Sequence, residues 1–319
     1  MAGPGSAKDK IMNRRTFSAR LAWLAGAALA GSALPEFVRA GARDSALDTD
    51  TDPLRLLARL EARDGGRLGV SVLDTGSGWA LAHRADERFP MCSTFKWVAA
   101  AAVLSRVERG QDLLDRRIRY GAADLVSYSP VTQPQVAQGM TLGNLCEAAV
   151  VWSDNTAANL LLSTLGGPPG ITAFARSHGD DQTRLDRIEP ALNEAEPGDP
   201  RDTTTPQAML QLLRRVVLDD GLAAPQRDQL ANWLRGCRTG DTRLRAGFPP
   251  DWVVGNKTGA GAHGTNNDVA VIWPQRGAPI VVAAYLTNSP ATRDAQNALL
   301  AETARIVSHA VIQARLRAG

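Results

Sequence analysis

The sequence predicts an α+β fold, in which an antiparallel sheet is built from both ends of the chain and helices are inserted between them. Strand patterns occur near the start, at Arg67–Asp74 and Gly78–His83. They return only near the end, at Trp252–Lys257, Asp268–Trp273 and Ile280–Leu286. The intervening stretch, from Phe89 to about Leu234, has mainly helical periodicity. We therefore expect a sheet subdomain (about 45–88 and 235–319), a helical subdomain (about 89–234) and a site in the cleft between them.

Local signals place the individual elements along the chain. A helix is predicted at Pro53–Ala62, because Asp52 can cap it and proline is favoured at its first position. The turn Thr75–Gly76–Ser77 predicts that the first two strands form a hairpin. Apolar residues at helical spacing predict further helices at Trp97–Val107, Leu142–Trp152, Thr156–Leu165, Ile171–Ser177, Gln207–Leu218 and from about Thr292 to Ala314.

The first 42 residues have the pattern of a secretory signal. Arg14–Phe17 precedes a mostly apolar run, Leu21–Leu34, and a small-residue cleavage pattern ends at Ala40 or Ala42. The arginine pair resembles a twin-arginine signal, which exports proteins already folded. The apolar run is shorter than the ~20 residues of a spanning helix. We therefore expect 1–42 to be a signal peptide and 43–319 to be a single catalytic domain in the periplasm, without stable membrane association.

Charge and cysteine content argue against several classes of function. Six basic and two acidic residues in 1–40 give that segment a charge of +4, whereas the whole chain has +3. The rest of the chain is therefore close to neutral, which gives no reason to expect a nucleic-acid partner. The three cysteines lack metal-ligand spacing, and the four histidines are scattered. We expect no metal site and no cofactor.

Ser93–Thr94–Phe95–Lys96 is the first candidate catalytic motif. A serine and a lysine three positions apart share one face of a helix that they open. Ser93 becomes a nucleophile only when a neighbour takes its proton, and Lys96 could do so if burial lowers its pKa. For an isolated Ser-x-x-Lys, a capping serine followed by a surface lysine is the commoner meaning.

Two further motifs change this interpretation. Ser153–Asp154–Asn155 lies between two helical stretches, and Lys257–Thr258–Gly259 ends a strand. Each alone is an ordinary capping tripeptide or strand end. In this order with Ser93–Lys96, they form the signature of serine β-lactamases and penicillin-binding proteins.

The mature chain resembles a class A serine β-lactamase over nearly its whole length. This resemblance implies an α/β sandwich of the type shared with penicillin-binding transpeptidases, with an inserted helical subdomain. The matching stretches are Met91–Lys96, Tyr128–Thr132, Ser153–Asn159, Glu189–Asn193, Asp199–Thr204 and Lys257–Gly261.

The resemblance also implies roles in acylation. Ser93 would attack the lactam carbonyl, and the backbone N–H groups of Ser93 and Ala260 would form the oxyanion hole. Ser153 would pass a proton to the leaving nitrogen, with Lys96 and Lys257 in reach. Whether Lys96 or Glu189 removes the proton of Ser93 stays open at this point.

Further residues are implied in substrate binding and deacylation. Asn155 would hold the side-chain amide of the substrate, Lys257 and Thr258 would bind its carboxylate, and Tyr128 would form an apolar wall. Arg243 matches a position where some relatives place an arginine near that carboxylate, although a solvated arginine is the alternative for it and for Arg245. The remaining implied roles concern one loop. On it, Glu189 and Asn193 would hold the deacylating water, and the Glu189–Pro190 peptide bond would be cis. Arg187 and Asp202 would form an ion pair at its base.

The sequence departs from the family pattern near these motifs. Asn256 stands where many relatives have aspartate before Lys-Thr-Gly, which removes a charge near Lys257. Cys92 lacks the partner that some carbapenem-hydrolysing relatives have, since Gly261 occupies that position, and Cys146 faces the same situation with Ala100. We expect three free thiols.

These residues predict a hydrolase that opens the β-lactam ring of penicillins and cephalosporins and gives antibiotic resistance, with these small molecules as its partners and a monomeric state. A D,D-peptidase and a β-lactam sensor that stays acylated are the alternatives. The pair Glu189 and Asn193 argues against the peptidase, and a sensor normally needs a membrane helix.

Overall fold

Five antiparallel strands in the order β2–β1–β9–β8–β7 form the central sheet of the computed structural model, which describes residues 51–318. β1 (Arg67–Asp74) and β2 (Ala80–His83) come from the start of the chain. β7 (Val253–Ala260), β8 (Asn266–Trp273) and β9 (Ile280–Thr287) come from its end. The pairing of β1 with β9, from Arg67 opposite Thr287 to Asp74 opposite Ile280, joins the two groups. The predicted α+β fold is confirmed. The predicted signal segment lies outside the described residues.

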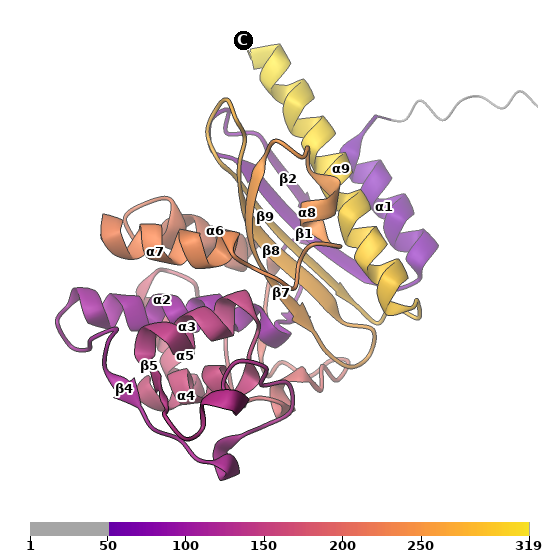
Figure 1. Ribbon diagram of the computed structural model, residues 1–319. Helices are drawn as coiled ribbons and strands as arrows, with labels where there is room; N and C mark the ends of the chain where they lie inside the picture. The colour runs from indigo at the N-terminus through magenta and orange to yellow at the C-terminus, as the bar shows by residue number, and fades with distance from the viewer. Residues whose placement is uncertain (1–50, 319) are drawn as a thin grey trace, which may run out of the picture. The chain divides into compact units, whose positions relative to one another are not determined.

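Helices cover both faces of this sheet (Figure 1). One face carries α1 (Pro53–Asp64), the short α8 (Leu244–Gly247) and the long C-terminal α9 (Arg293–Ala318). The remaining helices lie toward the other face and beyond it: α2 (Phe95–Glu108), α3 (Leu142–Val151), α4 (Asn155–Thr164), α5 (Pro168–Ser177), α6 (Pro206–Val217) and α7 (Ala224–Arg235). No helix in 51–318 is long and apolar enough to cross a membrane.

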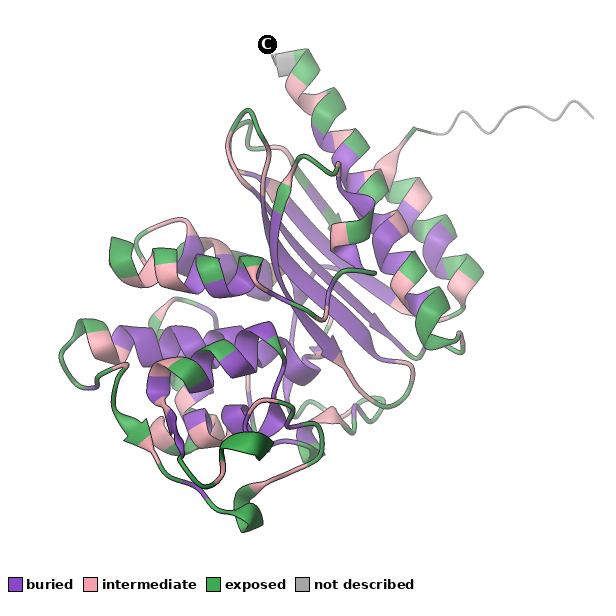
Figure 2. Cartoon of the chain, viewed as in Figure 1, coloured by how far each residue is buried: buried purple, intermediate pink, exposed green. Residues whose placement is uncertain are grey.

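The sheet is buried on both faces, because its apolar residues alternate between two cores (Figure 2). Along β9, Val281, Ala283 and Tyr285 belong to the core shared with α2, α3 and α6. Ile280, Val282, Ala284 and Leu286 belong to the core under α1 and α9. Successive strand residues point to opposite faces, so one apolar strand supports both layers.

The element positions agree closely with the sequence prediction. α1 begins at the expected Pro53, and the Asp52 side chain accepts a hydrogen bond from Leu54 N at 3.0 Å. The predicted strand Arg67–Asp74 is observed with the same ends. α7 was not predicted, and neither were two short strand pairs, β3 (Phe89–Pro90) with β6 (Thr203–Thr204) and β4 (Arg117–Ile118) with β5 (Met140–Thr141).

Candidate active site

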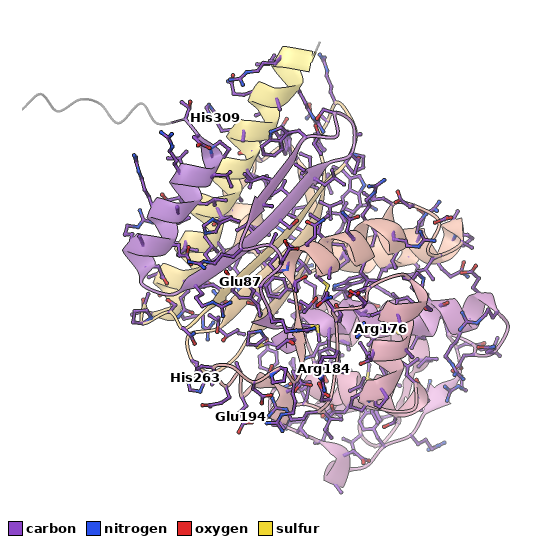
Figure 3. The ribbon with its side chains drawn as sticks, turned by 180° about the vertical axis from the view of Figure 1, so that it is seen from behind. Glu87, Arg176, Arg184, Glu194, His263 and His309 are labelled. Atoms are coloured by element: carbon purple, nitrogen blue, oxygen red, sulfur yellow. The ribbon has the colours of Figure 1, made fainter. Side chains whose placement is uncertain are left out.

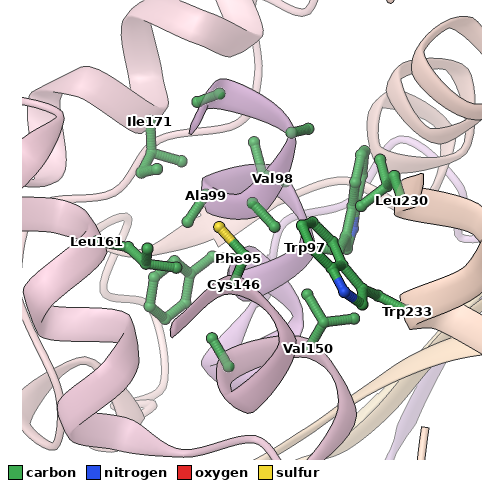
Figure 4. Close-up of a cluster of buried hydrophobic side chains, with 14 of the residues drawn as sticks. Phe95, Trp97, Val98, Ala99, Cys146, Val150, Leu161, Ile171, Leu230 and Trp233 are labelled. Carbon is green, nitrogen blue, oxygen red and sulfur yellow. The ribbon is translucent and has the colours of Figure 1, made fainter. Parts of the chain in front are cut away.

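Ser93 lies in a 3₁₀ turn, Cys92–Thr94, that leads directly into α2. α2 is apolar on almost every side and buried for most of its length, as expected of a helix inside a core. Phe95, Trp97 and Val98 pack among side chains of α3, α4, α5 and α7 (Figure 4). This packing fixes the turn, and Ser93 keeps 9% of its surface exposed.

Ser93 and Lys96 meet Glu189 below the surface. Ser93 Oγ donates a hydrogen bond to Glu189 Oε1 at 3.0 Å. Lys96 Nζ lies 3.0 Å from the same oxygen, and both side chains are fully buried. Burial lowers the pKa of Lys96, whereas the carboxylate of Glu189 acts in the opposite direction. The three predicted residues therefore form one connected cluster.

Lys96 is held from its other side by the second motif. Its ammonium group donates to the backbone oxygen of Ser153 at 2.7 Å and to Asn155 Oδ1 at 2.5 Å. Ser153 Oγ lies 3.4 Å from Lys96 Nζ and 3.0 Å from Lys257 Nζ. A single hydroxyl thus stands between two lysines that come from a helix and a strand.

The turn that carries Ser153 is strained and strongly braced. Ser153 has φ of 59°, a region that side-chain-bearing residues seldom adopt. The adjacent Asp154 caps α4 by accepting from Ala157 N at 2.8 Å. It also accepts from the backbone N–H groups of Val131 and Thr132 at 2.9 Å each. These bonds hold the Ser153 turn in its unusual conformation.

β7 brings the third motif against the Ser93 turn. Gly259 permits this approach, since a Cβ atom there would lie 2.6 Å from Met91 O. Lys257 Nζ also donates to Thr258 O at 2.8 Å. Burial lowers the pKa of Lys257 to about 7, and the charges of Lys96 and Arg243 act in the same direction. β7 ends at Ala260, beside the turn that holds Ser93.

Glu189 reaches Ser93 and Lys96 from a loop rather than from a helix or a strand. The Glu189–Pro190 peptide bond is cis, as predicted. Asn193 Nδ2 donates a short hydrogen bond to Glu189 Oε2. Asn159 ends one of the matching stretches and had no predicted role, yet its amide holds both backbone groups of Glu189, accepting from N and donating to O at 2.9 Å each.

The predicted ion pair at the base of this loop is confirmed. Arg187 Nε lies 2.6 Å from Asp202 Oδ2. Asp202 Oδ1 also accepts from the backbone N–H groups of Asp186 and Arg187 at 2.7 and 2.9 Å. Arg187 reaches a second carboxylate, that of Glu194, which is labelled in Figure 3. One buried carboxylate therefore closes the loop through side-chain and backbone contacts.

Two predicted binding residues lie at the edges of the site. Tyr128 is 59% exposed, and its backbone oxygen accepts from Asn155 N at 3.0 Å. Arg243 is buried behind β7, where its Nη1 donates to Gly259 O at 3.0 Å and its Nε donates to Asn297 Oδ1 at 3.2 Å. Burial lowers the pKa of Arg243. Asn297 was not singled out from the sequence, because its closeness to Arg243 depends on how α9 packs.

Asn256, noted above as a departure, joins a buried network under β7. Its Nδ2 donates to both carboxylate oxygens of Asp268 at 2.9 and 3.0 Å, and its Oδ1 accepts from Arg245 Nη2 at 2.9 Å. Burial raises the pKa of Asp268 to about 6, against the opposing effects of Arg243 and of the hydrogen bond from Asn256. Arg245 therefore lies on this network rather than in solvent.

Cys92, Cys146 and Cys237 are free thiols, and all three are buried. Within residues 51–318, no group of histidine, cysteine and acidic side chains could hold a metal ion. The polar groups that meet at the site are the hydroxyls of Ser93 and Ser153, the ammonium groups of Lys96 and Lys257, and the carboxylate of Glu189.

Comparison with known proteins gives a consistent result. A profile of the β-lactamase enzyme family matches residues 54–311. β-Lactamase CTX-M-97 of Escherichia coli is 51% identical over 253 residues, which is 79% of this chain and 87% of that protein. β-Lactamase AST-1 of Nocardia asteroides is 54% identical over 254 residues, 80% of this chain and 82% of that protein. Among solved structures, an ancestral class A β-lactamase is 62% identical with a TM-score of 0.80, covering 81% of this chain and 99% of that one.

Proposed function

The chain belongs to the class A β-lactamase family and is a β-lactamase, and from this premise we propose that it hydrolyses penicillins and cephalosporins through an acyl-enzyme on Ser93. The observation that carries the proposal is the buried cluster in which the Ser93 hydroxyl and the Lys96 ammonium group meet the same carboxylate oxygen of Glu189. We infer a role in antibiotic resistance from the same chemistry.

Acylation begins when Ser93 Oγ attacks the lactam carbonyl carbon and loses its proton. The hydrogen bond from Ser93 to Glu189 favours Glu189 as the acceptor, and Lys96 stabilises the carboxylate from 3.0 Å. Negative charge then develops on the carbonyl oxygen. The backbone N–H groups of Ser93 and Ala260 stabilise it as an oxyanion hole, because β7 lies against the Ser93 turn.

Collapse of this intermediate breaks the lactam C–N bond, and the leaving nitrogen needs a proton. Ser153 donates it; the distances from its hydroxyl to Lys96 Nζ (3.4 Å) and to Lys257 Nζ (3.0 Å) support this role. Lys96 can resupply that proton to Ser153 and recover one from the Glu189 carboxyl group 3.0 Å away, so that Glu189 is again a carboxylate before deacylation. The strained backbone at Ser153 keeps the hydroxyl between them.

Deacylation transfers the acyl group from Ser93 to water. Glu189 acts as the general base that takes a proton from this water and returns it to Ser93 Oγ as the ester bond breaks, and Asn193 orients the Glu189 carboxylate by its hydrogen bond to Oε2. A positioned base typically contributes about 10²–10⁴-fold to the rate. This step separates a β-lactamase from a protein that is acylated and stays so.

Substrate contacts come from three elements. Lys257 and Thr258 on β7 bind the carboxylate of the drug, and Arg243 behind β7 adds positive charge to this end of the site. Asn155 binds the side-chain amide, and the exposed ring of Tyr128 forms a wall. The mature chain, 43–319, would act as a periplasmic monomer after its twin-arginine signal is removed.

The proposal is tested by steady-state hydrolysis of one penicillin and one cephalosporin. We expect turnover of both by the wild type and a loss of at least about a thousandfold in the Ser93→Ala variant, since the nucleophile is removed. A Ser93→Ala variant that hydrolyses both drugs at the wild-type rate would contradict the proposed acyl-enzyme.

A further inference from the structure

The loop that connects α7 to α8 carries Thr239 to the edge of β7. Two backbone hydrogen bonds fix this loop, from Cys237 N to Leu234 O at 3.2 Å and from Arg238 N to Val151 O at 2.9 Å. The second bond ties the loop to the last residue of α3, just before the Ser153 turn. Thr239 is therefore held in place from both α7 and α3, and it is half-buried.

The side chain of Thr239 joins a short chain of hydroxyl and thiol groups that ends at Thr258. Thr239 Oγ1 lies 2.6 Å from Thr258 Oγ1, a close hydroxyl–hydroxyl contact. On its other side, Cys237 Sγ lies 3.4 Å from Thr239 Oγ1. Cys237 and Thr258 are almost completely buried, at 1% and 3% exposure.

The number of hydrogens on each group determines which of these hydroxyls donates and which accepts. A hydroxyl has one hydrogen and can accept through its lone pairs. A carboxylate only accepts, so Thr258 must give its own hydrogen to bind one. It can do so and keep its contact with Thr239 only if Thr239 donates to Thr258. The thiol of Cys237 can then donate to the oxygen of Thr239.

We propose that Thr239 is a positioning residue for the substrate carboxylate, which it serves by donating to Thr258 and so directing the Thr258 hydroxyl into the cleft. This inference rests on the proposed function, since it presumes that Thr258 binds that carboxylate. Donation by Thr239 also polarises the Thr258 hydroxyl, because linked hydrogen bonds strengthen one another.

The test measures kcat/KM for a penicillin and for its methyl ester, which lacks the charged acceptor. In Thr239→Val, a variant of nearly the same shape, we expect kcat/KM for the free acid to fall about three- to tenfold, as the loss of one net hydrogen bond implies. The value for the ester should not change. Thr239→Ser keeps the hydroxyl and should restore the wild-type value for the acid.

A matched control breaks a similar contact elsewhere in the domain. Thr287, at the end of β9, has its Oγ1 2.9 Å from Thr265 Oγ1, and both residues are buried. Thr287→Val should leave the ratio of kcat/KM for the free acid to kcat/KM for the ester unchanged. Equal losses for acid and ester in Thr239→Val would overturn the proposal, because they would indicate a general change in the shape of the site.

A double-mutant cycle separates positioning from direct contact. If Thr239 acts through Thr258, Thr239→Val should not lower kcat/KM for the free acid any further in a Thr258→Val background. A full additional loss there would overturn the proposal in favour of direct contact. If Thr258→Val itself does not lower kcat/KM for the free acid relative to the ester, Thr258 does not bind the carboxylate. The role proposed for Thr239 is then also wrong.

Discussion

The ion pair between Arg187 and Asp202 should determine both the stability of the Glu189 loop and the rate of deacylation. Asp202 is 1% exposed and accepts three hydrogen bonds, two from backbone N–H groups and one from Arg187 Nε at 2.6 Å. Asp202→Asn keeps an oxygen for the backbone donors. It places an NH₂ group opposite the guanidinium of Arg187, so that two donors face each other.

The magnitude follows from what the substitution removes. A charge-assisted hydrogen bond contributes about 1.5–3 kcal/mol, and breaking a fully buried ion pair costs about 3–5 kcal/mol. The Arg187 side chain is 15% exposed and retains Glu194, so we expect a loss of about 2–3 kcal/mol in the free energy of unfolding. For a domain of this size that is about 4–12 °C in Tm. Displacement of Glu189 should also lower kcat roughly 10–100-fold.

Thermal and urea unfolding, together with penicillin turnover, measure these effects. Asp220→Asn is the control, because the side chains of Asp220 and its partner Arg215 are 83% and 51% exposed, so that water solvates the pair. We expect no measurable change of Tm in that control. If Asp202→Asn has the Tm of the wild type and turns over penicillin at the wild-type rate, the ion pair does not hold the loop and the reasoning is refuted.

The further predictions concern buried titratable groups. Because the pKa of Lys257 is about 7, kcat/KM for a penicillin should decline as the pH rises through 7, and Lys257→Arg should move that decline upward; an unchanged profile in the variant would exclude Lys257 as the titrating group. The folded state binds the Asp268 proton more tightly than the unfolded state does, so the free energy of unfolding should decrease from about pH 4 to 6. Asn256→Asp puts a second carboxyl beside Asp268, which should extend this decrease to higher pH in urea titrations; coincident curves for variant and wild type would disprove that coupling. A thiol reagent should modify no cysteine in the folded protein and three in urea, and fast labelling of the folded protein would contradict their burial.

Local chemistry predicts much of this fold. Capping residues mark helix ends wherever a side chain bonds its own backbone, as Asp52 does at α1 and Asp154 at α4. Long apolar strands also stand out, because both faces of the sheet are buried. α7 escaped prediction because much of it is polar and its buried residues cluster near its end. The strand pair β3–β6 depends on residues that are far apart in sequence, such as Phe89 and Thr204.

The candidate site, like the fold, could be predicted only in part from the sequence. Motifs identify the candidate residues Ser93, Lys96 and Glu189, and the structure brings these together. The roles of two supporting residues could not be predicted, since Asn159 meets Glu189, and Thr239 meets Thr258, only through tertiary packing. The sequence could not decide between a role near the substrate and a solvated side chain for Arg243 and Arg245, since their contacts with β7 also depend on tertiary packing.

The most direct test of the mechanism is the intact mass of a Glu189→Ala variant after exposure to a penicillin, followed by peptide mapping. Loss of the proposed deacylation base should leave a stable acyl adduct on Ser93, whereas the wild type turns the drug over and returns to its free mass. An adduct on the wild type without turnover, or a Glu189→Ala variant that hydrolyses the drug at the wild-type rate, would contradict the role assigned to Glu189.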